Sequence, residues 1–159
     1  MEQSDQLAAL IDTGRTLRAA NIPFALIGGI AVGIRSGIPR ATDDIDVAVA
    51  TTAARSAVTQ VLEAVGFTFQ REFEHSVNYR HPNGEPVQAA FDPLFDEMIG
   101  RAEPIAILGE EIPVVLTEDL IEMKMRASRS PARRKSKSLR DQADAELLRG
   151  DVPGPDEGW

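Results

Sequence analysis

The sequence predicts one α+β (mixed α/β) domain, in which helices flank a small mixed β-sheet and a helical part follows at the C-terminus. Its 159 residues fit one domain better than two. Apolar residues at helical spacing near both ends enclose a middle region of short apolar and alternating runs, which is typical of strands. We therefore expect a single domain over 1–149, with a core at about 22–116, helices at 117–149 and a flexible tail at 150–159.

The first predicted elements are a helix and a buried strand. Pro23 forbids continuation of the N-terminal helix. Residues 24–27, Phe-Ala-Leu-Ile, form a short apolar run that predicts a buried strand. This strand leads into Gly28 and Gly29, after which residues 30–35 predict a short helix.

The next predicted strand carries two acidic residues. Ile45, Val47 and Val49 alternate with the period of a strand. Because residues i and i+2 point the same way, Asp44 and Asp46 present two carboxylates on one face. Two adjacent carboxylates repel each other, and a hard cation such as Mg²⁺ removes that cost by binding their oxygens. The alternative interpretation is a solvated entry to the strand.

Two hairpins supply most of the remaining strands. Residues 76–80 and 87–91 flank a turn rich in Pro, Asn and Gly, which predicts the first hairpin. Residues 105–108 and 112–115 flank Gly-Glu-Glu, which predicts the second. A short strand at 67–69 precedes both.

Three further helices complete the expected secondary structure. One starts at Thr51 or Thr52 and stops at Gly66. Thr117 caps the second helix, and the third runs to about Leu148.

The composition narrows the classes of function. The net charge of −8 argues against non-specific binding of nucleic acid, which needs Lys and Arg, except through a local basic patch. The absence of cysteine excludes disulfides and thiolate zinc sites. No apolar run approaches the roughly 20 residues that span a bilayer, and the N-terminus is unlike a signal peptide. We expect a cytoplasmic protein with no membrane partner.

The glycine pair and the acidic pair together form a recognisable pattern. Phe-Ala-Leu-Ile-Gly-Gly-Ile-Ala at 24–31, then Arg-x-Thr-x-Asp-Ile-Asp-Val at 40–47, resembles the signature of the nucleotidyltransferase superfamily that includes DNA polymerase beta. The resemblance is closer to the minimal AbiEii and MenT toxin-type nucleotidyltransferases, which also favour Gly-Gly and Arg-x-Ser/Thr before the acidic pair. Gly29 departs from the general signature, in which a Ser at this position would contact the terminal phosphate. The alternative for the glycine pair taken alone is that the two glycines only allow a tight turn.

The resemblance implies a nucleotidyltransferase-like fold and a set of site residues. The residues expected to bind the nucleotide are Gly28, Gly29, Arg40, Thr42 and Lys124. The residues expected to be catalytic, and to hold Mg²⁺ or Mn²⁺, are Asp44, Asp46 and Asp92. An NTP would be the substrate, with its phosphates near the glycine pair, because glycine lets backbone N–H groups approach a phosphate.

Asp92 is the candidate for the third carboxylate that the superfamily carries on a neighbouring strand, where it is often the base for the attacking hydroxyl. The alternative for Asp92 is a turn or helix cap, and Asp96 is the reserve candidate. Lys124 would contact the triphosphate, or else pair with Glu118 or Glu122 on the helix surface.

The C-terminal part adds two further features. Arg140-Asp141-x-x-Asp144 resembles the Lys-Asp-x-x-Asp of the final helix in these proteins, and we expect Asp141 to order Arg or Lys side chains. A basic run at 126–140 could receive RNA or the triphosphate, or it could be a solvated helix face. This run comprises Arg126, Arg129, Arg133, Arg134, Lys135, Lys137 and Arg140.

These expectations amount to a metal-dependent nucleotidyltransferase that moves an NMP from an NTP to an acceptor hydroxyl and forms part of a toxin–antitoxin pair. An RNA end, such as that of tRNA, or a protein side chain is the favoured acceptor, and a partner protein or a homodimer could complete the acceptor site. One alternative is a catalytically inactive relative that binds a nucleotide or partner, and another is a small-molecule (antibiotic) nucleotidyltransferase. A Rossmann-type dinucleotide binder is disfavoured, because Gly28, Gly29 and Gly33 do not make G-x-G-x-x-G.

Overall fold

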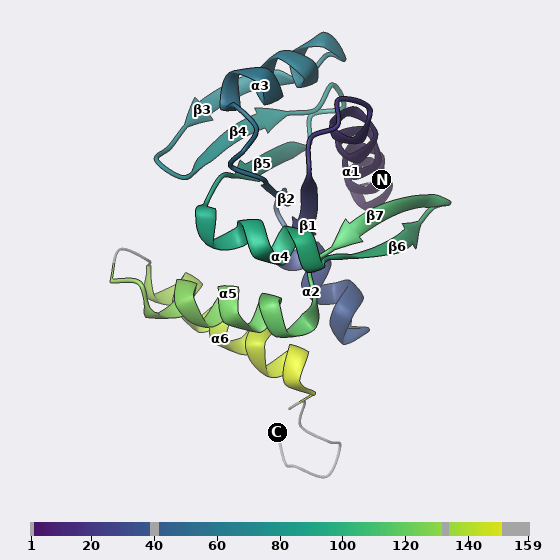
Figure 1. Cartoon of the computed structure of the whole chain (residues 1–159). Helices are drawn as coiled ribbons and strands as arrows, with labels where there is room; N and C mark the ends of the chain where they lie inside the picture. The colour runs from purple at the N-terminus through teal and green to yellow at the C-terminus, as the bar shows by residue number, and fades with distance from the viewer. Residues whose placement is uncertain (1, 39–41, 132–133, 151–159) are drawn as a thin grey trace.

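The computed structural model describes residues 2–38, 42–131 and 134–150, and within them it forms a mixed seven-stranded sheet with helices around it (Figure 1). The strands are β1 (Phe24–Ile27), β2 (Ile45–Val49), β3 (Thr68–Glu72), β4 (Ser76–Arg80), β5 (Pro86–Ala90), β6 (Glu103–Ile107) and β7 (Glu110–Val114). The helices are α1 (Glu2–Ala19), α2 (Gly28–Ser36), α3 (Arg55–Ala64), α4 (Asp96–Arg101), α5 (Thr117–Arg129) and α6 (Lys135–Arg149), with a 3-10 turn η1 (Pro93–Phe95). The predicted α+β class is confirmed.

The strand order β3-β4-β5-β2-β1-β7-β6 places β2 and β1 near the middle of the sheet. The pairs β2–β5 and β1–β7 are parallel, and the other neighbours are antiparallel. Both predicted hairpins are confirmed as β4–β5 and β6–β7. The acidic strand therefore has a hydrogen-bonded neighbour on each side.

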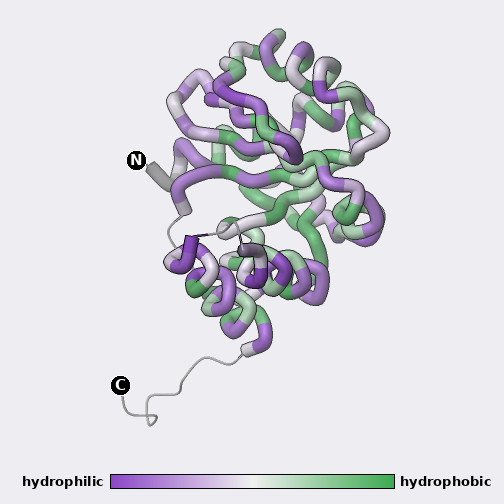
Figure 2. The backbone as a smooth tube through the Cα atoms, turned by 90° about the vertical axis from the view of Figure 1, so that its left-hand side faces the viewer, coloured by the Kyte–Doolittle hydropathy of each residue, from purple (hydrophilic) through white to green (hydrophobic). Residues whose placement is uncertain are grey.

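Two groups of helices pack around this sheet. Helices α1 and α3 contact each other, and they also contact β2, β3 and β7. Helices α5 and α6 form an antiparallel pair that packs on α2, below the sheet in Figure 1. Along the backbone, α5 and α6 alternate between hydrophilic and hydrophobic residues (Figure 2), as expected for helices that bury one side. No helix among the described residues has both the length and the apolar character that a membrane span requires.

Three helix starts differ from the predicted ones. Helix α2 begins at Gly28, so the glycine pair forms its first turn. Helix α3 begins at Arg55, with Ala54 at the cap position, and Thr51 is instead bonded to Asp96: its backbone N–H donates to Asp96 Oδ1 over 3.0 Å and its hydroxyl donates to the same carboxylate. Helix α5 begins at Thr117, with Leu116 at the cap position, so Thr117 does not cap it. The expected tail lies outside the described residues, except for Gly150.

Candidate active site

The two carboxylates of the acidic motif lie at the start of the central strand β2. Asp44 directly precedes the strand, and Asp46 is its second residue. Asp46 is paired with Ile27 on β1 and with Gln88 on β5. Ile45, between the two acids, is fully buried and Asp46 is half-buried, as the predicted alternation requires, but Ala48 is fully buried as well, so the alternation does not extend along the whole strand. The motif is thus held at the point where β1 passes into α2.

Gly28 lies directly against the Asp46 carboxylate. Its φ of 74° is a left-handed conformation that side-chain-bearing residues rarely adopt. A Cβ placed on Gly28 would lie 2.3 Å from Asp46 Oδ2 and 2.8 Å from Asp46 Cβ. A glycine at position 28 therefore lets the first turn of α2 approach the carboxylate.

The electrostatic surroundings of Asp44 come from both halves of the chain. Burial of the carboxylate, followed by repulsion from Asp43, raises the pKa of Asp44 above its ordinary value. Lys137 of α6 and Lys124 of α5 oppose that rise, because each cation favours the charged carboxylate. The C-terminal helix pair therefore presents positive charge toward the acidic motif.

Lys124 is held in a largely buried ion cluster between α5 and α6. Its Nζ lies 3.0 Å from Asp144 Oδ2 and 3.5 Å from Asp141 Oδ1, and both aspartate side chains are only 2% exposed. Asp141 thus orders a lysine, as expected. Glu122, one of the surface partners considered for Lys124, pairs with Arg126.

Sequence reasoning left Asp144 without a role, although it is the nearer partner of Lys124. The signal was available in the spacing of Asp141 and Asp144, which puts both carboxylates on one side of a helix. Their burial could not be read from that spacing, because it depends on how α5 packs against α6.

The loop before β2 is ordered by Thr42. Its hydroxyl donates to the Asp44 carbonyl over 3.4 Å, and its own carbonyl accepts from the Gln6 side chain over 2.8 Å. Thr42 thus contacts the backbone of the acidic motif. Arg40, the other residue expected in this loop, lies outside the described residues.

Asp92 is not brought to the carboxylate pair. Its Oδ1 accepts from the Leu94 backbone N–H over 3.0 Å, so the side chain caps η1. The β5 residue beside Asp46 is Gln88, and Asp92 follows it by four residues, or about 13 Å along an extended chain. Within the described chain, no three His, Asp or Glu side chains gather as a group that could hold a metal ion.

The donor chemistry of Asp44 and Asp46 nevertheless fits a hard divalent cation. Both side chains are carboxylates, and Asp46 Oδ1 is shielded from solvent. Burying negative charge is costly unless an opposite charge compensates it. Mg²⁺ and Mn²⁺ prefer oxygen ligands, and Mg²⁺ is usually held by one or two carboxylates, with water and substrate phosphates as its other ligands.

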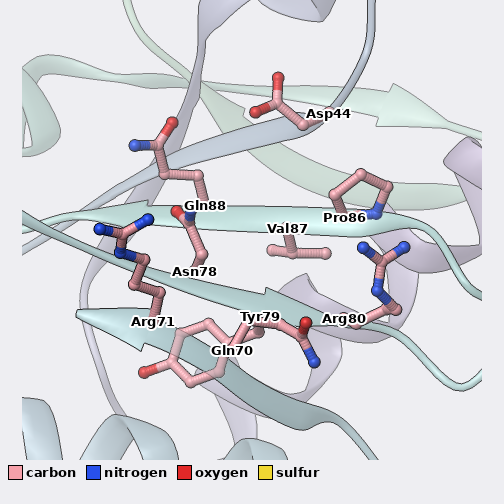
Figure 3. Close-up of a pocket in the computed structure, with 9 residues that line it drawn as sticks. All are labelled: Asp44, Gln70, Arg71, Asn78, Tyr79, Arg80, Pro86, Val87 and Gln88. Carbon is pink, nitrogen blue, oxygen red and sulfur yellow. The ribbon is translucent and has the colours of Figure 1, made fainter. Parts of the chain in front are cut away.

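A cavity of about 300 Å³ opens beside Asp44, over strands β3, β4 and β5 (Figure 3). The residues that line it are Asp44, Gln70, Arg71, Asn78, Tyr79, Arg80, Pro86, Val87 and Gln88. Sequence reasoning assigned a role only to Asp44 among these. The others belong to strands whose lateral order could not be read from the sequence.

The basic run is divided between the two C-terminal helices. Arg126 is bonded to Glu122 within α5, whereas Lys135 and Lys137 lie in the first turn of α6 and are exposed. Arg133 lies outside the described residues. Of the described members, Lys137 is a cation that acts on Asp44.

Comparisons with known proteins bear on the family and the fold of this chain. The profile of a family described as "Nucleotidyl transferase AbiEii toxin, Type IV TA system" matches residues 14–154. Among the curated proteins, none matches the chain.

Several solved structures share the fold at low sequence identity. ANT(2″)-Ia in complex with adenylyl-2″-tobramycin is 17% identical with a TM-score of 0.61, over 92% of this chain and 98% of that one. The lincomycin-bound lincosamide antibiotic adenylyltransferase LnuA is 15% identical with a TM-score of 0.62, over 93% and 97%. A Thermotoga maritima protein described as a nucleotidyltransferase is 16% identical with a TM-score of 0.64, over 89% and 94%. Since the family profile spans most of the sequence, the chain belongs to the AbiEii family of toxin nucleotidyltransferases and is a nucleotidyltransferase enzyme.

Proposed function

We propose that the enzyme transfers a nucleoside monophosphate from an NTP to an acceptor hydroxyl, at a site built on Asp44 and Asp46. The observation that carries the proposal is the meeting of three parts of the chain. The turn at Gly28 lies against Asp46, and cations of α5 and α6 act on Asp44. Anionic phosphates and acidic side chains can share such a site when positive charge surrounds them.

Each part has a role in binding the NTP. Backbone N–H groups in the first turn of α2 would receive the phosphates, because the N-terminus of a helix favours negative charge. Lys124 would meet the triphosphate as a point charge, held in place by Asp141 and Asp144. Asp44 and Asp46 would hold Mg²⁺ or Mn²⁺, which neutralises charge on the phosphate oxygens when it is bound.

The proposed reaction is an in-line substitution at the α-phosphorus. The acceptor oxygen forms a bond to that phosphorus, and the bond from the phosphorus to the pyrophosphate oxygen breaks. The hydroxyl proton passes to solvent, and pyrophosphate leaves with the electron pair of the broken bond. The protein contributes chiefly by positioning the two reactants and by stabilising charge.

The test is transfer from each α-labelled NTP, with Mg²⁺, to total cellular RNA and protein. Wild type should release pyrophosphate and label an acceptor, and Asp46→Asn should lower the rate at least about 100-fold because a ligand charge is lost. Glu118→Gln is the matched control, since Glu118 is an exposed acid on α5. If the wild-type protein transfers nothing from any of the four NTPs, the proposal is contradicted and an inactive binding protein is favoured. Full activity of Asp46→Asn would also contradict the proposal, because it would place the reaction elsewhere.

The biological role follows the family, whose members are described as type IV toxins. We infer that the partner is an antitoxin whose presence relieves the effect of the transferase. Expression of wild type alone should arrest bacterial growth, and Asp46→Asn should not. Growth arrest by both proteins would show that toxicity does not come from transfer.

Antibiotic modification remains the second candidate function. The observation in its favour is that two structures of this fold contain an antibiotic or its adenylylated product, tobramycin in one and lincomycin in the other. Those likenesses, below 25% identity, concern the fold. Tobramycin and lincomycin therefore belong among the acceptors tested.

A further inference from the structure

Four neighbouring strands align a row of polar side chains that begins at the acidic motif. Asp46 of β2 is paired with Gln88 of β5, and Gln88 with Asn78 of β4. Asn78 is in turn paired with Arg71 of β3. Side chains directly opposite each other on adjacent strands share a face of the sheet, so Arg71, Asn78 and Gln88 extend the face of Asp46.

This row lies on the side of β3–β5 away from α3. Val77 and Tyr79, which flank Asn78, are buried, and the Tyr79 hydroxyl bonds Thr59 of α3 over 2.7 Å. In Figure 3 the side chains of Asn78 and Gln88 rise from their strands on the side where Asp44 lies. The cavity beside Asp44 is the space in front of this row.

The amides in the cavity are suited to a hydroxyl. Asn78 and Gln88 both line the cavity, and an amide group can donate a hydrogen bond to a hydroxyl or accept one from it. Gln88 is oriented by its own bond to Ser76 Oγ over 3.2 Å, next to Asp46. A hydroxyl bound by these amides would lie beside the acidic motif.

The charges in the cavity are suited to an anion. Its lining carries two guanidinium groups, on Arg71 and Arg80, against the single carboxylate of Asp44. Arg80 is anchored by its bond to the Gly84 carbonyl, and Arg71 lies over the Phe73 ring at 5.0 Å. Guanidinium groups bind phosphate, and they repel a polycation.

We propose that this cavity is the acceptor subsite and that it selects a phosphorylated sugar hydroxyl over a polycationic acceptor. Gln88 and Asn78 position the hydroxyl beside Asp46, and Arg71 binds the phosphate. The backbones at Gln88 and Arg71 are two strand spacings, or about 10 Å, apart. The long side chain of Arg71 can reach across part of that distance. The assignment rests on the proposed transferase function. A free nucleotide and the terminal nucleotide of an RNA both carry this chemistry.

Binding to the transfer-deficient Asp46→Asn protein tests the subsite without relying on transfer. The probe is a short fluorescent single-stranded RNA with a free 3′-hydroxyl, and the competitors are AMP, adenosine and tobramycin. We expect the RNA or AMP to bind, AMP to compete at least tenfold better than adenosine, and tobramycin to compete poorly. Binding of the RNA that AMP displaces only at a concentration far above that of the RNA identifies an RNA end as the acceptor, and binding of a fluorescent AMP without binding of the RNA identifies a free nucleotide.

Arg71→Gln, added to Asp46→Asn, should weaken binding of the phosphate-bearing ligand at least tenfold. The matched control is Arg149→Gln, because Arg149 is an exposed arginine at the far end of α6. Equal affinities of the two variants, or tighter binding of tobramycin than of AMP, would overturn the assignment. If wild type labels no acceptor although these binding results hold, the transferase proposal fails and the subsite stands as a binding site.

Discussion

The carboxylate of Asp46 lies so close to Gly28 that a single added carbon at position 28 would come within 2.3 Å of Asp46 Oδ2. Gly28→Ala should therefore displace Asp46 and strain a backbone with φ of 74°. We expect a loss of about 2–4 kcal/mol in the free energy of unfolding, from the left-handed conformation and the overlap together. Transfer should fall by at least about 100-fold, as expected when a catalytic group moves by an ångström. Denaturant unfolding and steady-state kinetics measure the two effects.

Gly33→Ala is the control for that prediction, since it lies in the same helix. A Cβ on Gly33 meets only the Ile38 carbonyl oxygen, at an ordinary 3.6 Å. Alanine favours a helix interior over glycine by about 0.8–1 kcal/mol, so this variant should keep its activity and gain slightly in stability. Equal losses from the two substitutions would contradict the special role of Gly28.

Asp44→Asn should raise the thermal stability of the protein while it abolishes transfer. Burial raises the pKa of Asp44, so its charged form is disfavoured in the folded protein. In chelator at neutral pH, the asparagine variant should therefore have a higher Tm than wild type, although its transfer activity is lost. The gain should shrink as the pH falls through the raised pKa toward the ordinary value, because the wild-type carboxyl then becomes neutral as well.

Mg²⁺ adds a second readout to the same pair of proteins. It should raise the Tm of wild type, because a ligand that binds only the folded state stabilises it. It should have a much smaller effect on Asp44→Asn. A variant less stable than wild type in chelator at neutral pH would show that the charge of Asp44 is compensated without a metal ion.

The acidic motif could be predicted because its information is local. Alternation around Ile45 defines a strand whatever its neighbours are, and Gly28 follows an apolar run that ends in a turn. The position of Gln88 beside Asp46 could not be predicted from local sequence in this way. Gln88 stands beside Asp46 because β2 and β5 pair in parallel in one register, and neither strand encodes that register alone.

Dependence on distant parts of the chain also explains why the predicted start of α3 was wrong. Thr51 is a good helix cap by residue type, but it is held away from that role by two hydrogen bonds to Asp96, 45 residues further along, and α3 begins only at Arg55. A tertiary contact overrode a local preference. The partners of Lys124 could not be read from α5 either, because the two carboxylates that hold it belong to α6.

Lys124→Met should destabilise the protein as well as inactivate it. It leaves the nearly buried carboxylates of Asp141 and Asp144 without their lysine, a change that costs about 3–5 kcal/mol when one partner of a buried ion pair is removed. The triple variant Lys124→Met, Asp141→Asn, Asp144→Asn should recover most of that stability but not the activity. Recovery of activity in the triple variant would show that Lys124 has only a structural role.

Asp92→Ala tests whether the third carboxylate of the superfamily lies at this position. The Asp92 side chain caps η1 through Leu94, and Gln88 occupies the place beside Asp46. We expect a loss of about 1 kcal/mol in stability, the usual contribution of a cap, and a transfer rate within about threefold of wild type. Asp92→Asn should retain the cap and the stability, because the asparagine oxygen accepts the same hydrogen bond. A rate loss in both variants as large as that of Asp46→Asn would instead make Asp92 the third catalytic carboxylate, and would require β5 to shift when substrate binds.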